Sequence, residues 1–306
     1  DEQAAQQIQA INQQIYSRED PEINRLYDWG KKISFDYFDH ILEKLNIANN
    51  KRYFESQSAA IGLDFVRQNL GSVFEESVGA VIYPGERAGL HTRVFITSNG
   101  LPTYETKDLG LAELKKRDYP AAARSIIITA NEQSEYFKVM LAALGEFDKD
   151  LASKTTHLAH GFVSLSTGKM SSRTGEVYGA VELISDVETA VKKLYPEAQV
   201  DPSLGAVKYG FLRHRLGSDI IYDIDESVSL EGNSGPYLQY AHARACSILA
   251  KAQAPATTER VELDSAERSL ARIISQYPEI VSAATDDFMP HLITNHLYAL
   301  TQKFNS

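Results

Sequence analysis

One continuous apolar run constrains the fold of this chain more than any other feature of its sequence. The run Ser125-Ile126-Ile127-Ile128-Thr129-Ala130 has no polar alternation, which predicts a strand buried on both faces in a parallel sheet. An amphipathic helix follows and ends at Gly145, with a stripe formed by Phe137, Met140, Leu141 and Leu144. A strand, a short turn and a helix make half of a βαβ unit, so this part of the chain is predicted to be α/β.

The chain on either side of this unit is predicted to supply further helices and a hairpin. Asp20-Pro21 pairs an N-cap residue with a proline suited to the first helical position, so a helix is expected to begin there. Residues 93–106 predict a β-hairpin, because two extended segments flank Asn99-Gly100. A later helix, closed by Pro196, is expected to present one apolar face made of Val181, Ile184, Val187, Val191 and Leu194.

From Gly232 onward the pattern is helical only, which predicts two domains, residues 1–231 and residues 232–306. Residues 254–258 have the composition of a linker, and Pro278 is expected to interrupt a helical stripe. The stripes are typical of the core seams of a helix bundle. The last one runs almost to Ser306, so the bundle is expected to be cut short.

Composition excludes some classes of protein. No apolar run approaches the ~20 residues that a membrane-spanning helix needs, so no membrane role is expected. A single cysteine, Cys246, excludes an internal disulfide and fits a reducing cytoplasm. The net charge of −10 is unusual for a partner of nucleic acid. Arg213-His214-Arg215 and Lys192-Lys193 are candidate basic patches, but taken alone they favour no RNA role.

A short basic loop carries the strongest chemical signal. Lys169-Met170-Ser171-Ser172-Arg173 lies between Gly168 and Gly175 and precedes a helix. Cations on a glycine-hinged loop suit a reaction in which negative charge leaves as pyrophosphate, although a solvated basic turn explains Lys and Arg beside Gly equally well. The whole string resembles the Lys-Met-Ser-Lys-Ser loop of class I aminoacyl-tRNA synthetases, in the form that some arginyl-tRNA synthetases carry.

Three polar residues are candidates for binding a guanidinium. Tyr104 lies at the end of the predicted hairpin and Asp108 at the start of the next helix. Gln133 follows the carboxyl end of the apolar strand, where ligands bind in open α/β sheets. A carboxylate fork matches the planar donors of arginine. Each residue alone is more often a cap, a strand or a turn residue. The segment 98–109 resembles one of arginyl-tRNA synthetases, and the resemblance implies that all three residues contact arginine.

Two further segments extend the resemblance. His157-Leu158-Ala159-His160-Gly161-Phe162-Val163 is similar to the strand ahead of the lysine loop, which implies that His160, Lys169 and Met170 lie near ATP. Metal binding by His157 and His160 is not expected, because no Cys or carboxylate partner is near. Residues 231–244 resemble the junction with the anticodon-binding helices, where we expect Tyr240 and Arg244 to contact tRNA.

The resemblance runs from Ile8 to Phe304, and it has two departures. No His-x-Gly-His sequence is present, although class I enzymes use that pair at the ATP phosphates, and Ser172 stands where the second loop lysine is usual. The expected fold is therefore the second half of a class I, Rossmann-like nucleotide-binding catalytic domain followed by an all-α anticodon-binding bundle. The chain is expected to be the carboxyl-side part of a longer enzyme and to be inactive alone.

The resemblance implies an arginine–tRNA ligase. The whole enzyme would join L-arginine to tRNA(Arg) through an arginyl-adenylate, using ATP with Mg²⁺ as its counter-ion, in the cytoplasm and as a monomer. Lys169 and Arg173 would be catalytic, by neutralising the departing pyrophosphate. The alternative is a non-catalytic tRNA-binding fragment or paralogue. The missing histidine motif favours this alternative, whereas the acidic net charge disfavours it.

Overall fold

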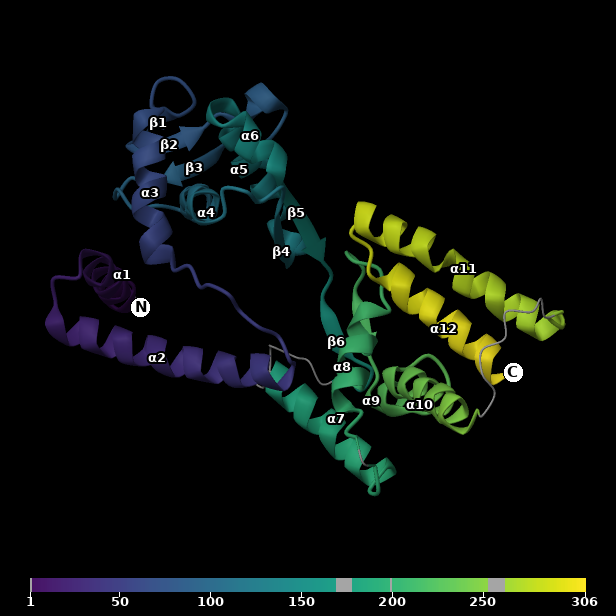
Figure 1. Ribbon diagram of the computed structural model, residues 1–306. Coiled ribbons are helices and arrows are strands. Elements are labelled where there is room, and N and C mark those ends of the chain that lie inside the picture. The colour runs from purple at the N-terminus through teal and green to yellow at the C-terminus, as the bar shows by residue number, and fades with distance from the viewer. Residues whose placement is uncertain (1, 169–177, 199, 253–261) are drawn as a thin grey trace. The chain divides into compact units, whose positions relative to one another are not determined.

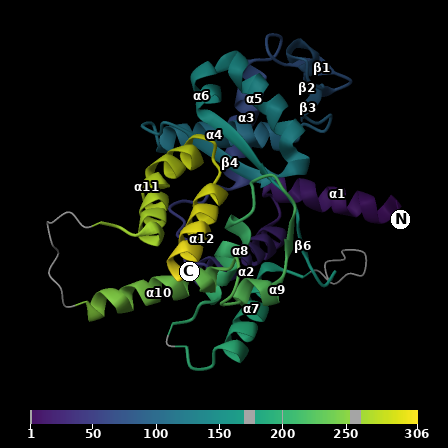
Figure 2. The same ribbon diagram turned by 90° about the vertical axis from the view of Figure 1, so that its right-hand side faces the viewer.

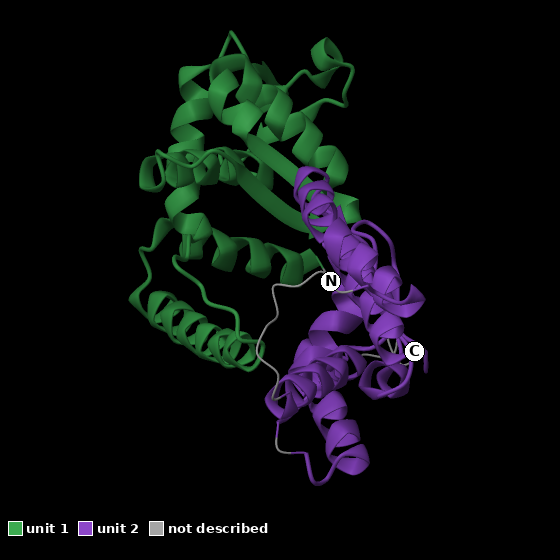
Figure 3. Ribbon diagram, turned by 45° about the vertical axis from the view of Figure 1, so that its right-hand side comes forward, with its two compact units in different colours: residues 1–158 green, residues 159–306 purple. Residues whose placement is uncertain are grey.

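The computed structural model describes residues 2–168, 178–198, 200–252 and 262–306. The chain divides into two compact units, residues 1–158 (unit 1) and residues 159–306 (unit 2) (Figure 3). Each unit is described by itself. The predicted domain boundary between residues 231 and 232 falls inside unit 2 and stays a prediction.

Unit 1 begins with three helices, α1 (Glu2–Ser17), α2 (Pro21–Lys44) and α3 (Glu55–Gln68) (Figure 1). The predicted start of α2 is confirmed, because the Asp20 carboxylate accepts hydrogen bonds from the backbone N–H groups of Glu22 and Ile23. Pro21 takes the first helical position, where its missing N–H has no partner to lose.

A small antiparallel sheet follows, made of β1 (Glu75–Ser77), β2 (Ala80–Tyr83) and β3 (Arg93–Ile96), with the 3₁₀ turn η1 (Gly85–Ala88) between β2 and β3. The predicted hairpin over residues 93–106 is only partly formed. The chain turns at Asn99-Gly100 and returns as far as a single bridge between Ile96 and Pro102.

Helix α4 (Tyr104–Asp118) takes the place of the second hairpin arm. Its first turn is tied to β3, because the hydroxyls of Thr103 and Thr106 both donate to the Phe95 carbonyl oxygen, at 3.1 and 2.6 Å. Helices α3 and α4 cross closely. A Cβ atom on Gly62 would lie 1.8 Å from the Thr106 carbonyl oxygen, so glycine is required there. These contacts fix the helix that carries Tyr104 and Asp108.

The predicted strand is β4 (Ser125–Ala130), which pairs with β5 (Thr155–His160) in a separate sheet. The expected burial of both faces is wrong, since Ile126 is 43% exposed and Ile128 is 61% exposed. In the described part of the chain, β5 is the only strand that pairs with β4, and no second layer covers this face. Continuous apolar sequence predicted the strand correctly but not how much of it this chain buries.

The predicted helix after β4 is confirmed as α5 (Ser134–Phe147), preceded by η2 (Asn131–Gln133) and followed by α6 (Lys149–Lys154). It continues two residues past the expected end at Gly145. One face of α5 enters the core of unit 1, a cluster built with β3, α3 and α4. Its large, fully buried side chains include Val66, Phe74, Tyr83, Phe95, Leu109, Met140 and Leu144.

Unit 2 begins with a parallel pair of strands, β6 (Val163–Leu165) and β7 (Ile220–Tyr222). Three helices accompany them, α7 (Ala180–Leu194), α8 (Ser203–Leu212) and α9 (Ile224–Val228). The predicted apolar face of α7 is confirmed at Ile184, Val187 and Val191, whereas Leu194 at the end of the helix is 52% exposed.

The helical end consists of α10 (Gly235–Lys251), α11 (Ser265–Asp286) and α12 (His291–Asn305) (Figure 2). The predicted interruption at Pro278 is wrong, because α11 runs through it. A proline removes one helical hydrogen bond, and α11 packs against α12. The predicted linker at residues 254–258 lies outside the described residues.

None of the helices in the described ranges is long and apolar enough to cross a membrane.

Candidate functional site

The central feature of the candidate site is a polar pair that joins α4 to α5. The Tyr136 hydroxyl, in the first turn of α5, donates a hydrogen bond to Oδ2 of Asp108 on α4. Both side chains are half-buried. The Tyr136 ring packs against Phe137, with ring centroids 4.3 Å apart. The carboxylate therefore has a fixed neighbour and a defined position at the edge of the unit 1 core.

Burial dominates the electrostatics of this pair. Burial raises the pKa of Asp108, although the Tyr136 hydrogen bond and the charge of Lys115 act to lower it. Burial also raises the pKa of the Tyr136 phenol, and the neighbouring Asp108 charge raises it further. The phenol therefore stays protonated as a donor. Lys115, two turns along α4 from Asp108, has its pKa lowered by burial.

Tyr104 lies one turn before Asp108 on the same face of α4, as residues four apart in a helix do. Its side chain is 67% exposed, and the Lys107 ammonium lies 5.0 Å from the centre of its ring. Lys107 Nζ also donates to Glu55 Oε2 at 2.6 Å. Burial lowers the pKa of Lys107, but hydrogen bonds to Glu55 and Tyr16 outweigh it, and the net pKa is raised.

Gln133 is exposed at the end of η2, three residues before Tyr136. The structure shows no hydrogen bond from its amide to Tyr104 or Asp108 in the part of the chain that it describes. Tyr104 and Asp108 are thus brought together by α4, whereas Gln133 is only placed beyond the carboxyl end of β4.

The two predicted histidines of β5 differ in their surroundings. His157 is a structural residue, because its ring stacks on Phe137 at 4.2 Å and its Nε2 lies 2.7 Å from the Thr129 hydroxyl. Burial lowers the pKa of His157. His160, at the end of β5, is exposed, and its Nδ1 lies 2.8 Å from the Gly161 carbonyl oxygen. Its ring is the one accessible to a ligand.

The chain just after His160 is held tightly to the strand β7 region. A Cβ atom on Gly161 would lie 2.2 Å from the Ser218 carbonyl oxygen, so only glycine fits. The Phe162 backbone N–H donates to Asp219 Oδ1 at 2.8 Å. This anchor fixes the start of the segment that leads to the basic loop. Lys169, Met170 and Arg173 lie outside the described residues.

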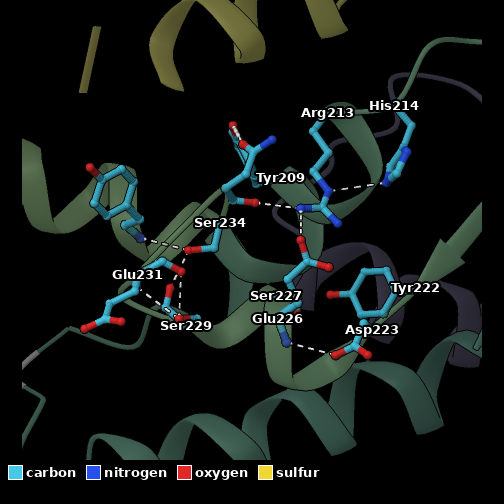
Figure 4. Close-up of polar contacts among 12 residues, drawn as sticks. Tyr209, Arg213, His214, Tyr222, Asp223, Glu226, Ser227, Ser229, Glu231 and Ser234 are labelled. Atoms are coloured by element: carbon cyan, nitrogen blue, oxygen red, sulfur yellow. Dashed lines mark hydrogen bonds and ion pairs between the residues drawn. The ribbon is translucent and has the colours of Figure 1, made fainter. Parts of the chain in front are cut away.

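The predicted basic cluster at residues 213–215 is tied into unit 2 through Arg213 (Figure 4). The Arg213 guanidinium donates to Glu226 Oε1 and to the Asn233 carbonyl oxygen, each at 2.7 Å. The Tyr209 hydroxyl donates to Asn233 Oδ1 at 2.5 Å. The Arg213 hydrogen bond lowers the pKa of Glu226. Arg213 is therefore a structural ion-pair residue that joins α8 to the segment before α10.

Helix α10 carries the two predicted tRNA contacts. Tyr240 is 48% exposed and Arg244 is exposed. The Arg244 guanidinium lies 5.9 Å from the ring centres of Tyr240 and Phe304 and donates to Asn305 Oδ1 at 2.7 Å. The cation is positioned by α12 but remains accessible.

In the described ranges no three His, Cys, Asp or Glu side chains gather closely enough to hold a metal ion. Mg²⁺ stays a prediction as the counter-ion of ATP.

Comparison with known proteins shows what this chain is similar to. Residues 238–306 match the family described as DALR anticodon binding domain. Arginine–tRNA ligase of Flavobacterium psychrophilum is 31% identical over 303 residues, which cover 94% of this chain and 50% of that protein. The enzyme of Streptococcus agalactiae serotype III is 32% identical over 305 residues, covering 94% and 53%. The predicted resemblance to arginyl-tRNA synthetases is confirmed.

Solved structures give the same fold. Arginyl-tRNA synthetase of Plasmodium falciparum superposes with a TM-score of 0.78 at 19% identity, covering 94% of this chain and 52% of that one. The Thermus thermophilus arginyl-tRNA synthetase gives 0.74 at 24% identity, covering 94% and 59%. The predicted fold class, an α/β part followed by a helical part, is confirmed. The chain spans about half the length of the curated relatives that it matches.

Sequence reasoning missed Tyr136 and Lys115. Tyr136 is the third residue of a helix whose apolar stripe drew attention to its neighbour Phe137, and it is 28 residues from Asp108. Only the packing of α4 beside α5 pairs them. Their signal in the sequence was limited to a tyrosine near the carboxyl end of the predicted strand, close to the candidate Gln133.

Proposed function

We propose that the whole protein ligates L-arginine to tRNA(Arg) through an arginyl-adenylate formed from ATP. The observation that carries this proposal is sequence similarity to arginine–tRNA ligases over 94% of the chain. The half-buried Asp108 carboxylate supports it, because a fixed carboxylate is the natural partner of a guanidinium.

In the proposed reaction a carboxylate oxygen of arginine attacks the α-phosphorus of ATP, and the bond to pyrophosphate breaks on the opposite side. The protein contributes position and charge rather than covalent chemistry. Asp108 would accept from the guanidinium, with Tyr104 and Gln133 beside it. In unit 2, His160 and Met170 would lie against ATP.

Lys169, with Arg173, would neutralise the pyrophosphate as its charge grows. Mg²⁺ would arrive with ATP and screen the phosphates. The adenylate would then be attacked by a terminal ribose hydroxyl of tRNA, and AMP would leave. Helix α10, through Tyr240 and Arg244, would contact the tRNA.

We infer a cytoplasmic site of action, where the exposed thiol of Cys246 stays reduced.

The test is arginine-dependent exchange of pyrophosphate into ATP by the whole protein, with and without tRNA. We expect exchange with arginine and none with lysine, whose ammonium lacks the planar fork. The isolated 306-residue chain is expected to show no exchange, because it has no His-x-Gly-His sequence. Exchange by the isolated chain would refute that expectation. tRNA binding by the whole protein without any exchange would instead favour the non-catalytic binding module.

A further inference from the structure

The Asp108–Tyr136 pair has a property that simple binding of a guanidinium does not require. The half-buried Asp108 carboxylate already has one protein donor, because the Tyr136 hydroxyl donates a hydrogen bond to its Oδ2. No hydrogen bond to Oδ1 is present in the described ranges. The carboxylate is thus satisfied on one oxygen and open on the other.

We infer that Tyr136 is a positioning residue that orients the Asp108 carboxylate and leaves Oδ1 to receive the guanidinium of arginine. This inference rests on the proposed function. A carboxylate held by one fixed donor is restricted in its rotation. The entropy cost of orienting it when the substrate binds is therefore small.

The surrounding charges explain why a donor is needed. Glu55, at the start of α3, and Glu105, one turn earlier on α4, both raise the pKa of Asp108, while Lys115 lowers it. Arg93, on β3, acts on the Tyr136 phenol and forms an ion pair with Glu105 at 3.1 Å. Two carboxylates therefore oppose ionisation of Asp108, and the Tyr136 hydroxyl is the group that directly contacts its charge.

A purely structural role for Tyr136 predicts something different. The Tyr136 ring packs on Phe137, and a phenylalanine would retain that packing. Only the hydroxyl contacts Asp108. Removing the hydroxyl while keeping the ring therefore separates the two roles.

The experiment uses the whole protein and compares Tyr136→Phe with Tyr119→Phe. Tyr119 lies at the end of α4 and is 46% exposed, so it is a matched tyrosine outside the site. KM for arginine and kcat are measured by pyrophosphate exchange with tRNA present, from mildly acidic to mildly alkaline pH. Arginine loses its partner when Asp108 is protonated, so KM rises as the pH falls.

For Tyr136→Phe we expect KM for arginine to rise by about tenfold or more, the size of a lost hydrogen bond to a charged group, with kcat nearly unchanged. The hydroxyl lowers the pKa of Asp108. Its removal should therefore move the acidic rise in KM to higher pH. Tyr119→Phe should do neither.

A second variant, Lys115→Met, separates charge from orientation. It also removes an influence that lowers the pKa of Asp108, so the acidic rise should again move to higher pH. At alkaline pH, where Asp108 is ionised in every variant, KM of Lys115→Met should return close to the wild-type value, whereas KM of Tyr136→Phe should stay raised. Its result stands even if Tyr136→Phe proves unstable in thermal unfolding.

The outcomes are distinct. If the wild-type protein shows no arginine-dependent exchange, the proposed function fails and the inference fails with it. If the wild type is active but Tyr136→Phe matches Tyr119→Phe in KM and in pH profile, only the role of Tyr136 is overturned. A rise in KM of Tyr136→Phe that disappears at alkaline pH, together with an identical pH profile for Lys115→Met, would also overturn the orienting role of Tyr136. Tyr136 would then act only through the pKa of Asp108.

Discussion

The core of unit 1 is closely packed, whereas the helical end of unit 2 buries few of its side chains. In unit 1 the side chains of Phe95, Leu109 and Leu144 are fully buried, and the candidate carboxylate sits at the edge of that closed core. In α11 only Ala284 is buried, and in α12 only His296 and Thr301, within the described residues. The fixed Asp108–Tyr136 pair thus lies beside a fully packed core, whereas the accessible cation of Arg244 lies where packing is shallow.

The helical end also leaves an apolar groove. Its volume is about 1230 Å³, and its lining includes Leu194, Leu230, Leu238, Ile274, Leu297 and Phe304. The amphipathic stripes predicted from the sequence thus pack against one another only in part in this chain. The accessible cation of Arg244 lies beside one wall of the groove, on the α10–α12 face.

The largest expected effect is a loss in free energy of unfolding, and this loss should differ between the two regions. Leu144→Ala, in the closed core, is expected to cost about 2–5 kcal/mol, whereas Leu297→Ala, at the groove, should cost less than half as much because its side chain is only partly buried. Hydrogen exchange of α5 and α12 in the whole protein gives the two local opening free energies. Equal losses would remove the contrast between the regions.

A kinetic effect of similar size is expected in unit 2, from the loop outside the described residues. Lys169→Ala should lower kcat for adenylate formation by about 10²–10³-fold with little change in KM for arginine, because its charge partner grows only as pyrophosphate leaves. The rate of pyrophosphate exchange measures this, and Lys192→Ala on α7 is the control for loss of a positive charge.

The same assay decides the role of Arg173. Arg173→Ala should lower kcat less than Lys169→Ala does if the Arg173 side chain points to solvent or tRNA. A loss equal to that of Lys169→Ala would show that Arg173 does the work of the missing second lysine. No loss at Lys169 itself would reduce the loop to a basic turn.

A smaller effect is expected in unit 1, where a substitution should weaken arginine binding without lowering stability. Asp108→Asn is expected to weaken arginine by about 1–3 kcal/mol, the value of a hydrogen bond to a charged group. KM for arginine, with KM for ATP as the internal control, measures it. A change in KM for ATP alone would contradict the placement of arginine at Asp108.

The pH dependence of stability gives Asp108 a second signature. Because its pKa is raised in the folded protein, the folded state holds more protons than the unfolded state just above the ordinary aspartate pKa. Stability is therefore lost as the pH rises through the folded-state pKa. Asp108→Asn should remove that loss, so its thermal unfolding temperature at neutral pH should equal or exceed that of the wild type. A lower temperature would show that the charge is favourable to the fold.

The smallest effect is expected on the accessible face of α10. Arg244→Ala should weaken tRNA binding by a few-fold and reduce the salt slope by about one, as for loss of one phosphate contact. Arg268→Ala on α11 is a control of equal charge change. Filter binding at several salt concentrations measures both, and equal slopes for wild type and Arg244→Ala would exclude a phosphate contact.

Local signals predicted elements well and their surroundings poorly. Asp20-Pro21 marked the start of α2 correctly, because a cap acts through neighbouring backbone groups. The hairpin formed only in part, and the predicted interruption at Pro278 was wrong. The hydroxyls of Thr103 and Thr106 donate to the Phe95 carbonyl oxygen where α4 begins, inside the expected second arm of the hairpin. Helix α11 continues through Pro278 and packs against α12.

The candidate site divides in the same way. The sequence by itself determined only that Tyr104 lies at the end of an expected hairpin and Asp108 at the start of the next helix. That both residues share one face of α4 follows from the start of this helix at Tyr104, which the structure decided. The sequence could likewise place Gln133 after a strand. Only the tertiary structure decided that Tyr136, 28 residues away, donates to Asp108 and that His157 is committed to Phe137. Burial, and therefore the pKa of Asp108, depends on which elements pack together, and no local pattern encodes that.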